Sequence, residues 1–155
     1  MRRIAIGSDH AGFALKTMLK EHLQREGYPV LDFGTDSDQA VDYPDIVAPL
    51  ARAVAGGEAD LGVVVCSNGV GVSIVANKVP GVRAALCADP WTARRAREHT
   101  DANVLALGAF AIGSHVALEV LRAFLEGAFQ GGRHERRVAK INALDSSRAE
   151  ASPPK

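Results

Sequence analysis

The chain has 155 residues, of which 47% are hydrophobic and 23% charged, and its formal net charge is +0. This length predicts one domain with a sizeable core. The balanced charge excludes a global field that would attract nucleic acid or an anionic membrane. Because Asp9 and His10 interrupt the first apolar run early, we expect neither a signal peptide nor a membrane helix there. A cytoplasmic protein is expected, in which Cys66 and Cys87 form no disulfide framework.

Short apolar runs alternate with amphipathic stretches along the whole chain. The runs predict strands at 3–6, 29–33, 61–65, 82–87 and 103–107. The stretches predict helices at 13–25, 44–55, 72–77, 90–99, 116–125 and 133–141. This alternation favours an α/β fold, a three-layer α/β/α sandwich around a five-stranded parallel sheet.

Individual residues mark where several of these elements start. Pro44 favours the start of a helix, because its missing N–H costs nothing there. Asp89 and Ser114 are expected to cap the helices that follow them. The last segment, residues 145–155, is polar and rich in small residues. We therefore expect a single domain at 1–144 and a flexible tail at 145–155.

Residues 60–78, DLGVVVCSNGVGVSIVANK, combine a buried strand, a glycine-rich loop and the start of a helix. In parallel sheets, ligands bind beyond the carboxyl ends of the strands, where helix N-termini attract anions. Cys66 ends this strand, a position in which a cysteine is able to serve as a base or a nucleophile. The alternative interpretation is a small apolar residue that completes a buried strand.

The loop after Cys66 lacks the common phosphate-binding fingerprints. Gly69 and Gly71 begin a G-x-G pattern, but Ile74 stands where a dinucleotide fingerprint has its third glycine, and no G-K-[ST] follows. A cysteine phosphatase loop would need an arginine, and none occurs before Lys78. The remaining feature is a turn with several backbone N–H donors, which suits a small anion or a developing oxyanion.

Two further pairs of polar residues have alternative interpretations. Asp9 and His10 follow the first strand, either as ligand-binding residues or as a turn and helix cap. Arg133 and Arg137 are four residues apart and share a helix face. They form either a two-arginine clamp for phosphate or a solvated basic helix end.

Six separated motifs together resemble the ribose-5-phosphate isomerase B family, which also includes galactose-6-phosphate and allose-6-phosphate isomerases. They are IGSDHAGF at 6–13, DYPD at 42–45, CSNGVGVSIVANK at 66–78, VRAALC at 82–87, HTDANVLALG at 99–108 and GGRHERRV at 131–138. The resemblance implies the strand order 2-1-3-5-4. It also implies an aldose–ketose isomerase of the pentose phosphate pathway that uses no metal or cofactor. The implied assembly is a homodimer or a dimer of dimers, with each active site completed across the subunit interface.

The resemblance also implies roles for individual residues. Cys66 would be the catalytic base, and His99 the proton donor that opens the sugar ring. Asp9 would assist catalysis and, with His10, bind the sugar hydroxyls and the phosphate end. The other implied substrate-binding residues are Ser67, Asn68, Gly69, Val70, Gly71, Thr100, Asn103, Phe110, Arg133 and Arg137.

The expected reaction converts ribose 5-phosphate to ribulose 5-phosphate through an enediolate, whose negative charge the loop amides stabilise. Two departures from the family pattern occur: Ser67-Asn68 replaces Gly-Thr, and Phe110 replaces an arginine. Losing that arginine removes one bidentate phosphate contact.

Three alternatives from the sequence remain open. The first is a hexose-6-phosphate isomerase acting on allose or galactose, and the second is a sugar-phosphate binding protein without turnover. The third, a thiol redox protein, would lack a resolving cysteine at C-x-x-C spacing.

Overall fold

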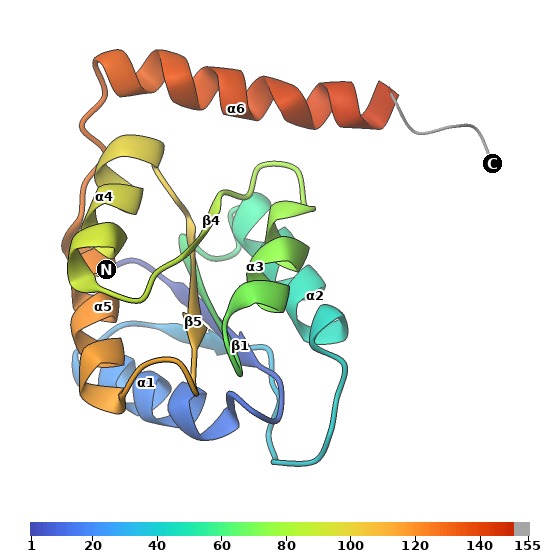
Figure 1. Cartoon of the computed structure of the whole chain (residues 1–155), viewed down its shortest axis with the longest axis vertical. Coiled ribbons are helices and arrows are strands. Elements are labelled where there is room, and N and C mark those ends of the chain that lie inside the picture. The colour runs from blue at the N-terminus through green and yellow to red at the C-terminus, as the bar shows by residue number, and fades with distance from the viewer. Residues whose placement is uncertain (151–155) are drawn as a thin grey trace.

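Five parallel strands form the centre of the protein, in the order β2-β1-β3-β5-β4, and the computed structural model describes residues 1–150. The strands are β1 (Ile4–Ser8), β2 (Val30–Asp32), β3 (Leu61–Cys66), β4 (Ala84–Leu86) and β5 (Val104–Gly108). The helices are α1 (Phe13–Arg25), α2 (Tyr43–Ala55), α3 (Val70–Asn77), α4 (Pro90–Thr100), α5 (Ser114–Glu126) and α6 (Arg133–Glu150). Figure 1 shows this arrangement, and both the predicted fold class and the predicted strand order are confirmed.

Helices cover both faces of the sheet and create two apolar cores. Helices α1, α4 and α5 pack on one face, around residues such as Leu19 and Phe124, and α2 and α3 pack on the other, around Val47 and Leu50 (Figure 1). All residues of β1, β3 and β5 are buried. This burial on both faces explains why the central strands are continuous apolar runs instead of alternating patterns.

Most predicted elements appear within one or two residues of their expected bounds, but three details are wrong: the length of β4, the cap of α5 and the length of α6. Strand β4 is shorter than 82–87, because the N–H of Arg83 donates to the side chain of Asn103. Gly113, not Ser114, is the N-cap of α5, and no side chain caps that helix. Asp89 does cap α4, since its Oδ1 accepts the N–H of Thr92 at 2.7 Å.

Helix α6 is longer than predicted. It continues past Ile141 to Glu150, so the first part of the predicted tail is helical. Asp145 ties this part to the body, because its Oδ2 accepts the N–H of Gly81 at 2.9 Å. The remainder of the predicted tail, 151–155, lies outside the described residues.

Helix α6 lies across the end of the sheet at which the strands begin (Figure 1). Beside it, the outer edge of β4 is bound by a side chain from α3. The amide of Asn77 accepts the N–H of Ala84 at 2.8 Å and donates to its carbonyl at 3.0 Å. None of the described helices is long and apolar enough to cross a membrane.

Candidate active site

Asp9 and His10 lie at the carboxyl end of β1. Asp9 is buried, with 7% exposed, and its Oδ1 accepts the N–H of Gly12 at 3.0 Å. Asp9 therefore closes the turn before α1, although no side chain caps that helix, and its second carboxylate oxygen is not needed for this bond. His10 is exposed, and its Nδ1 accepts the N–H of Val41 at 3.2 Å. A neutral His10 consequently carries its proton on Nε2, where it serves as a donor.

Cys66 ends the neighbouring strand β3 and contacts its own loop. Its Sγ accepts the N–H of Gly69 at 3.2 Å, and Asn68 Oδ1 lies 3.9 Å from the sulfur. Asn68 Oδ1 also accepts the N–H of Val70 at 3.0 Å. A backbone N–H directed at sulfur stabilises negative charge there. Cys66 as a residue is 4% exposed in the single chain, so only a small part of it is accessible.

Glycine is required at two positions of this loop. Gly69 has a φ of 79°, a left-handed conformation that favours glycine, and a Cβ there would lie 2.4 Å from Leu86 Cδ1. A Cβ on Gly71 would lie 2.6 Å from the ring of Tyr43. The bare backbone of Gly71 thus allows Tyr43 to pack directly on the cysteine loop.

Tyr43 connects the cysteine loop to the cavity beside Asp9 and His10. This cavity, of about 570 Å³, is lined by Asp9, His10, Val41, Asp42, Tyr43, Pro44 and Asp45. Tyr43 belongs to the DYPD motif, but the sequence alone indicated no role for it. The sequence signal for such a role was the position of Tyr43, an aromatic residue at the start of a helix that follows a long polar loop.

Ser67 and Phe110 complete this end of the sheet. The N–H of Ala109 donates to the carbonyl of Cys66, and the N–H of Phe110 donates to the carbonyl of Ser67, both at 2.8 Å. The side chain of Phe110 is 78% exposed beside the cysteine loop. We call this group, consisting of Asp9, His10, Tyr43, Cys66–Gly71 and Phe110, the cysteine end of the sheet.

The other predicted site residues lie where the strands begin. His99 and Thr100 form the last turn of α4, and Thr100 Oγ1 donates to the carbonyl of Ala96 at 2.6 Å. Asn103 precedes β5, and its side chain accepts the N–H of Arg83 and donates to the carbonyl of Gly81. Asn103 thus holds the start of β4.

His134, a residue that the sequence analysis did not assign, stacks on His99. The two ring centroids are 4.2 Å apart, and the ring planes differ by 9°. Burial lowers the pKa of His134, and the positive charges of His99, Arg133 and Arg137 lower it further. The lowered pKa favours the neutral form of His134. Its position inside the quoted GGRHERRV motif was the only sequence signal.

Arg133 and Arg137 lie in the first two turns of α6, with exposed side chains. We call the group of His99, Thr100, Asn103, Arg133, His134 and Arg137 the histidine end of the sheet. Cys66 pairs with Gly108 at one end of β5, and Gly62 pairs with Val104 at the other. Four residues of strand, about 13 Å, separate these two pairs. A single chain therefore does not bring Cys66 together with His99 or the two arginines.

Comparison with known proteins identifies the family. The profile of the Ribose/Galactose Isomerase family matches residues 4–141. The chain belongs to this family. Ribose-5-phosphate isomerase B of Escherichia coli (strain K12) is 45% identical over 148 residues, which are 96% of this chain and 99% of the relative. D-erythrulose-4-phosphate isomerase of Pectobacterium atrosepticum is 42% identical and covers 91% of this chain and 93% of its own length.

A solved structure agrees with this assignment. Ribose-5-phosphate isomerase B of Clostridium thermocellum superposes with a TM-score of 0.93 at 49% identity, covering 94% of this chain and 99% of that one. The resemblance stated from the motifs is confirmed, and so is the predicted class of reaction, the aldose–ketose isomerisation of a sugar phosphate.

Proposed function

We propose that this family member interconverts ribose 5-phosphate and ribulose 5-phosphate, in active sites that each combine the cysteine end of one copy with the histidine end of another. Support for the substrate comes from the E. coli and C. thermocellum relatives, which are named for ribose 5-phosphate and match nearly the whole chain. The observation that carries the shared site is the separation of Cys66 from His99 along the sheet.

In the proposed reaction, His99 of a second copy donates a proton to the ring oxygen and opens the sugar. As the ring opens, the anomeric hydroxyl loses its proton and becomes the carbonyl at C1. Cys66 then removes the proton from C2, a proton passes from O2 to O1 of the enediolate, and Cys66 returns its proton to C1. The resulting enediolate needs donors, and a single such donor contributes about a hundredfold or more in rate. Because Val70 donates its N–H to Asn68 Oδ1, an enediolate oxygen competes with that side chain for the same donor.

The ends of the molecule carry opposite charge, which supports this pairing. The loop and helix start at 34–45 contain Asp36, Asp38, Asp42 and Asp45 and no lysine or arginine, whereas residues 133–140 contain four basic residues and one acidic residue. A phosphate group is repelled by the acidic loop of its own cysteine end. It is attracted by Arg133 and Arg137 of the second copy.

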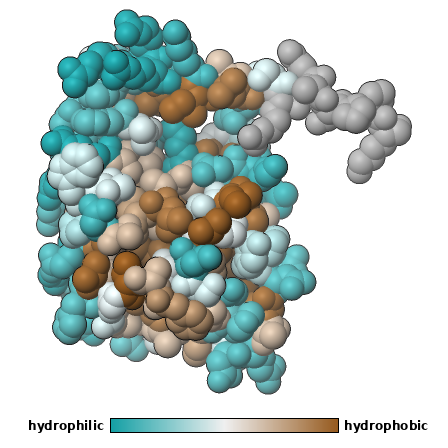
Figure 2. Space-filling model, viewed as in Figure 1, coloured by the Kyte–Doolittle hydropathy of each residue, from teal (hydrophilic) through white to brown (hydrophobic). Residues whose placement is uncertain are grey.

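An exposed apolar surface supports contact between copies. Figure 2 shows apolar side chains gathered on the face that carries α3 and β4, and beneath α6. The exposed large hydrophobic residues of these elements are Val70, Ile74, Leu86, Ile141 and Leu144. Exposed apolar surface of this kind is typical of a protein interface. A homodimer is therefore the proposed unit.

The proposed location is the cytoplasm. The free thiols of Cys66 and Cys87 support it, because disulfides are rare in that compartment.

Mixing two inactive variants tests the shared site. Cys66→Ala removes the base, and His99→Asn removes the ring-opening acid, so each variant alone should be inactive. If the two ends come from different chains, mixed dimers contain one intact site, and coexpression restores up to about a quarter of wild-type activity. Sites confined to single chains would give no recovery, which would reject the proposal. Singly expressed variants measured at the same total concentration are the control.

A second candidate is isomerisation of a sugar phosphate of another length. The D-erythrulose-4-phosphate isomerase relative favours it, and so does Phe110, which places an exposed apolar side chain beside the cysteine loop. A panel of four-, five- and six-carbon sugar phosphates, including allose and galactose 6-phosphates, separates these candidates by kcat/KM. Exchange of the C2 proton with solvent distinguishes any isomerase from a binding protein, which exchanges none.

A further inference from the structure

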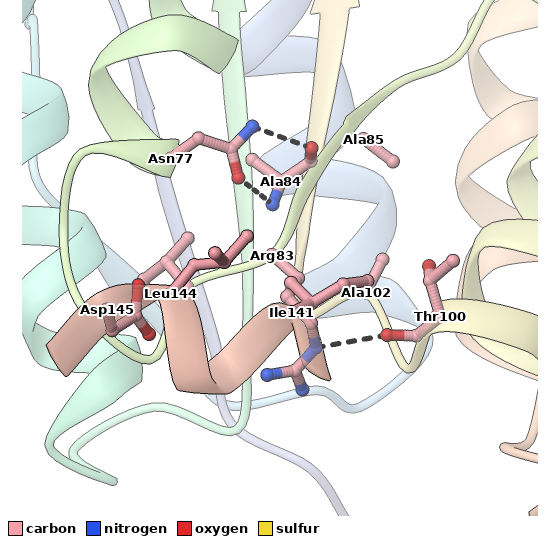
Figure 3. Close-up of a pocket in the computed structure, with 10 residues that line it drawn as sticks. Asn77, Arg83, Ala84, Ala85, Thr100, Ala102, Ile141, Leu144 and Asp145 are labelled. Carbon is pink, nitrogen blue, oxygen red and sulfur yellow. Dashed lines mark hydrogen bonds between the residues drawn. The ribbon is translucent and has the colours of Figure 1, made fainter. Parts of the chain in front are cut away.

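Arg83 contacts both of the elements that make up the histidine end. Its side chain is 16% exposed, and its guanidinium donates to two backbone carbonyls at the end of α4: Nε to Thr100 O at 3.0 Å and Nη2 to Asp101 O at 2.8 Å. On the other side, Nη1 donates to Oδ1 of Asn142 in α6 at 3.0 Å. Figure 3 shows Arg83 between the end of α4, at Thr100, and α6.

The acceptors on α4 belong to the turn that carries His99. Carbonyls at the end of a helix have no donor within the helix and carry partial negative charge, so a guanidinium satisfies them well. Asp101 adds an ion pair with Arg83, at 3.5 Å between Oδ2 and Nη2. Arg83, which directly precedes β4, therefore helps to fix the backbone that follows His99, together with Arg97, which donates to Asp101 Oδ1 and to the carbonyl of Ala102.

Helix α6 has few other attachments to the body. His134 stacks on His99, Val138 is buried, and Asp145 accepts the N–H of Gly81. Beneath the helix lies a cavity of about 430 Å³, whose lining includes Ile141 and Leu144 (Figure 3). Because α6 spans this cavity, its distance from α4 depends on a small number of polar bonds, and the bond from Arg83 to Asn142 is one of them.

We propose that Arg83 is a positioning residue for the isomerase reaction. It holds α6 against the end of α4, so that His99, Arg133 and Arg137 enter the site of the second copy as one preformed unit. Arg83 itself touches no substrate. A guanidinium provides this geometry because its planar donors reach several acceptors at once, which a lysine ammonium on a single stem does not reproduce. The proposal rests on the proposed function, in which the histidine end serves catalysis.

The kinetic test compares Arg83→Lys and Arg83→Met with Arg94→Met. Arg94 also joins two helices, through an exposed ion pair with Glu126 between α4 and α5, and is the matched control. Displacement of a catalytic group by about 1 Å costs on the order of a hundredfold in rate. Both Arg83 variants should therefore lower kcat and raise KM for phosphorylated sugars, while Arg94→Met leaves both unchanged. Wild-type kinetics in Arg83→Lys would overturn the proposal.

Asn142 variants keep the test valid if the Arg83 variants fold poorly. Asn142 is exposed, so its replacement leaves the core intact. Asn142→Asp retains the acceptor and should keep wild-type kinetics, whereas Asn142→Leu removes the acceptor and should lower kcat/KM. Equal kinetics of the two Asn142 variants would contradict the role of this bond.

Histidine resonances separate the positioning role from the proposed function. Stacking shifts the ring protons of His99 and His134, and NMR measures these shifts without any substrate. Loss of the shifts in Arg83→Lys and Asn142→Leu, but not in Arg94→Met, supports the positioning role even if ribose 5-phosphate proves not to be a substrate. Unchanged shifts in these variants would reject it, whatever the sugar.

Discussion

The cysteine end and the histidine end of the sheet are built differently. At the cysteine end, strands β1 and β3 and the backbone of tight loops fix the functional groups, and Asp9 and Cys66 are almost fully buried. At the histidine end, all the functional groups except Asn103 lie on α4 or α6, and Arg133 and Arg137 are exposed. One end is thus a pocket formed by strands and tight loops, and the other is a helical arm whose basic residues have no partner acid of their own within the described residues.

The largest loss of activity is expected from a substitution at the cysteine end. Cys66→Ala should lower kcat by about a thousandfold, because a positioned base contributes about 10²- to 10⁴-fold. Cys87→Ala is the control, since burial, and then the charge of Asp89, raise the pKa of the Cys87 thiol to about 11 and keep it protonated. Aldose–ketose interconversion measures both variants. Near-normal turnover of Cys66→Ala would remove the cysteine from the base role.

A stability measurement tests whether the buried lysine Lys16 stabilises the cysteine end. The buried ammonium of Lys16, 2% exposed, pairs with Asp32 at 3.0 Å and donates to the carbonyl of Thr35 at 2.5 Å. Thr35 is in turn bonded to Ser8. Lys16→Met should lower the free energy of unfolding by about 3 kcal/mol. Lys20→Met, which removes a more exposed partner of Asp32, should cost less than about 1 kcal/mol in the same urea titration.

Equal losses of unfolding free energy in Lys16→Met and Lys20→Met would show that the burial of Lys16 adds nothing to the stability that its charge provides.

A smaller effect is expected at the histidine end. Arg137→Ala should raise KM for phosphorylated sugars by about 10- to 100-fold, because a hydrogen bond to a charged group is lost. Unphosphorylated sugars should show little change. Arg136→Ala, which removes an exposed arginine from another face of the same helix, is the matched control. The same loss with both kinds of sugar would count against phosphate recognition.

The smallest expected effect concerns pH. Because the pKa of His134 is lowered in the folded protein, mainly by burial, the unfolded chain binds its proton more readily. His134 therefore stabilises the fold fully above its unfolded pKa of about 6.5, and this stability is lost as pH falls through the lower folded value. His134→Phe keeps an aromatic ring but cannot titrate. The decline in Tm below about pH 6.5 should be shallower in this variant, and an unchanged decline would exclude His134 as its source.

Much of the cysteine end could be predicted from sequence, because its chemistry follows local patterns. The apolar run before Cys66 required a strand buried on both faces, and the glycines after it required a tight turn. Asp9 was recognised by its place after the first strand. Tyr43 was missed because its role depends on contact with Gly71, far away in the sequence.

The histidine end was harder to predict, because its arrangement depends on packing between distant segments. The four-residue spacing of Arg133 and Arg137 was sufficient to place them on one helix face. Nothing in the local sequence indicated that His134 stacks on His99, or that Arg83 bonds both α4 and α6. The length of α6 was underestimated because its polar residues resemble a tail, whereas Asp145 bonds the body.

The two hydrogen bonds between Asn77 and Ala84 have a consequence for solubility. An outer strand with free N–H and carbonyl groups is a template on which foreign strands add and fibres grow. One amide side chain occupies the donor and the acceptor of Ala84, as another strand would. Asn77→Leu should therefore leave that edge open to strand addition, and the variant should aggregate faster on heating than the native chain does.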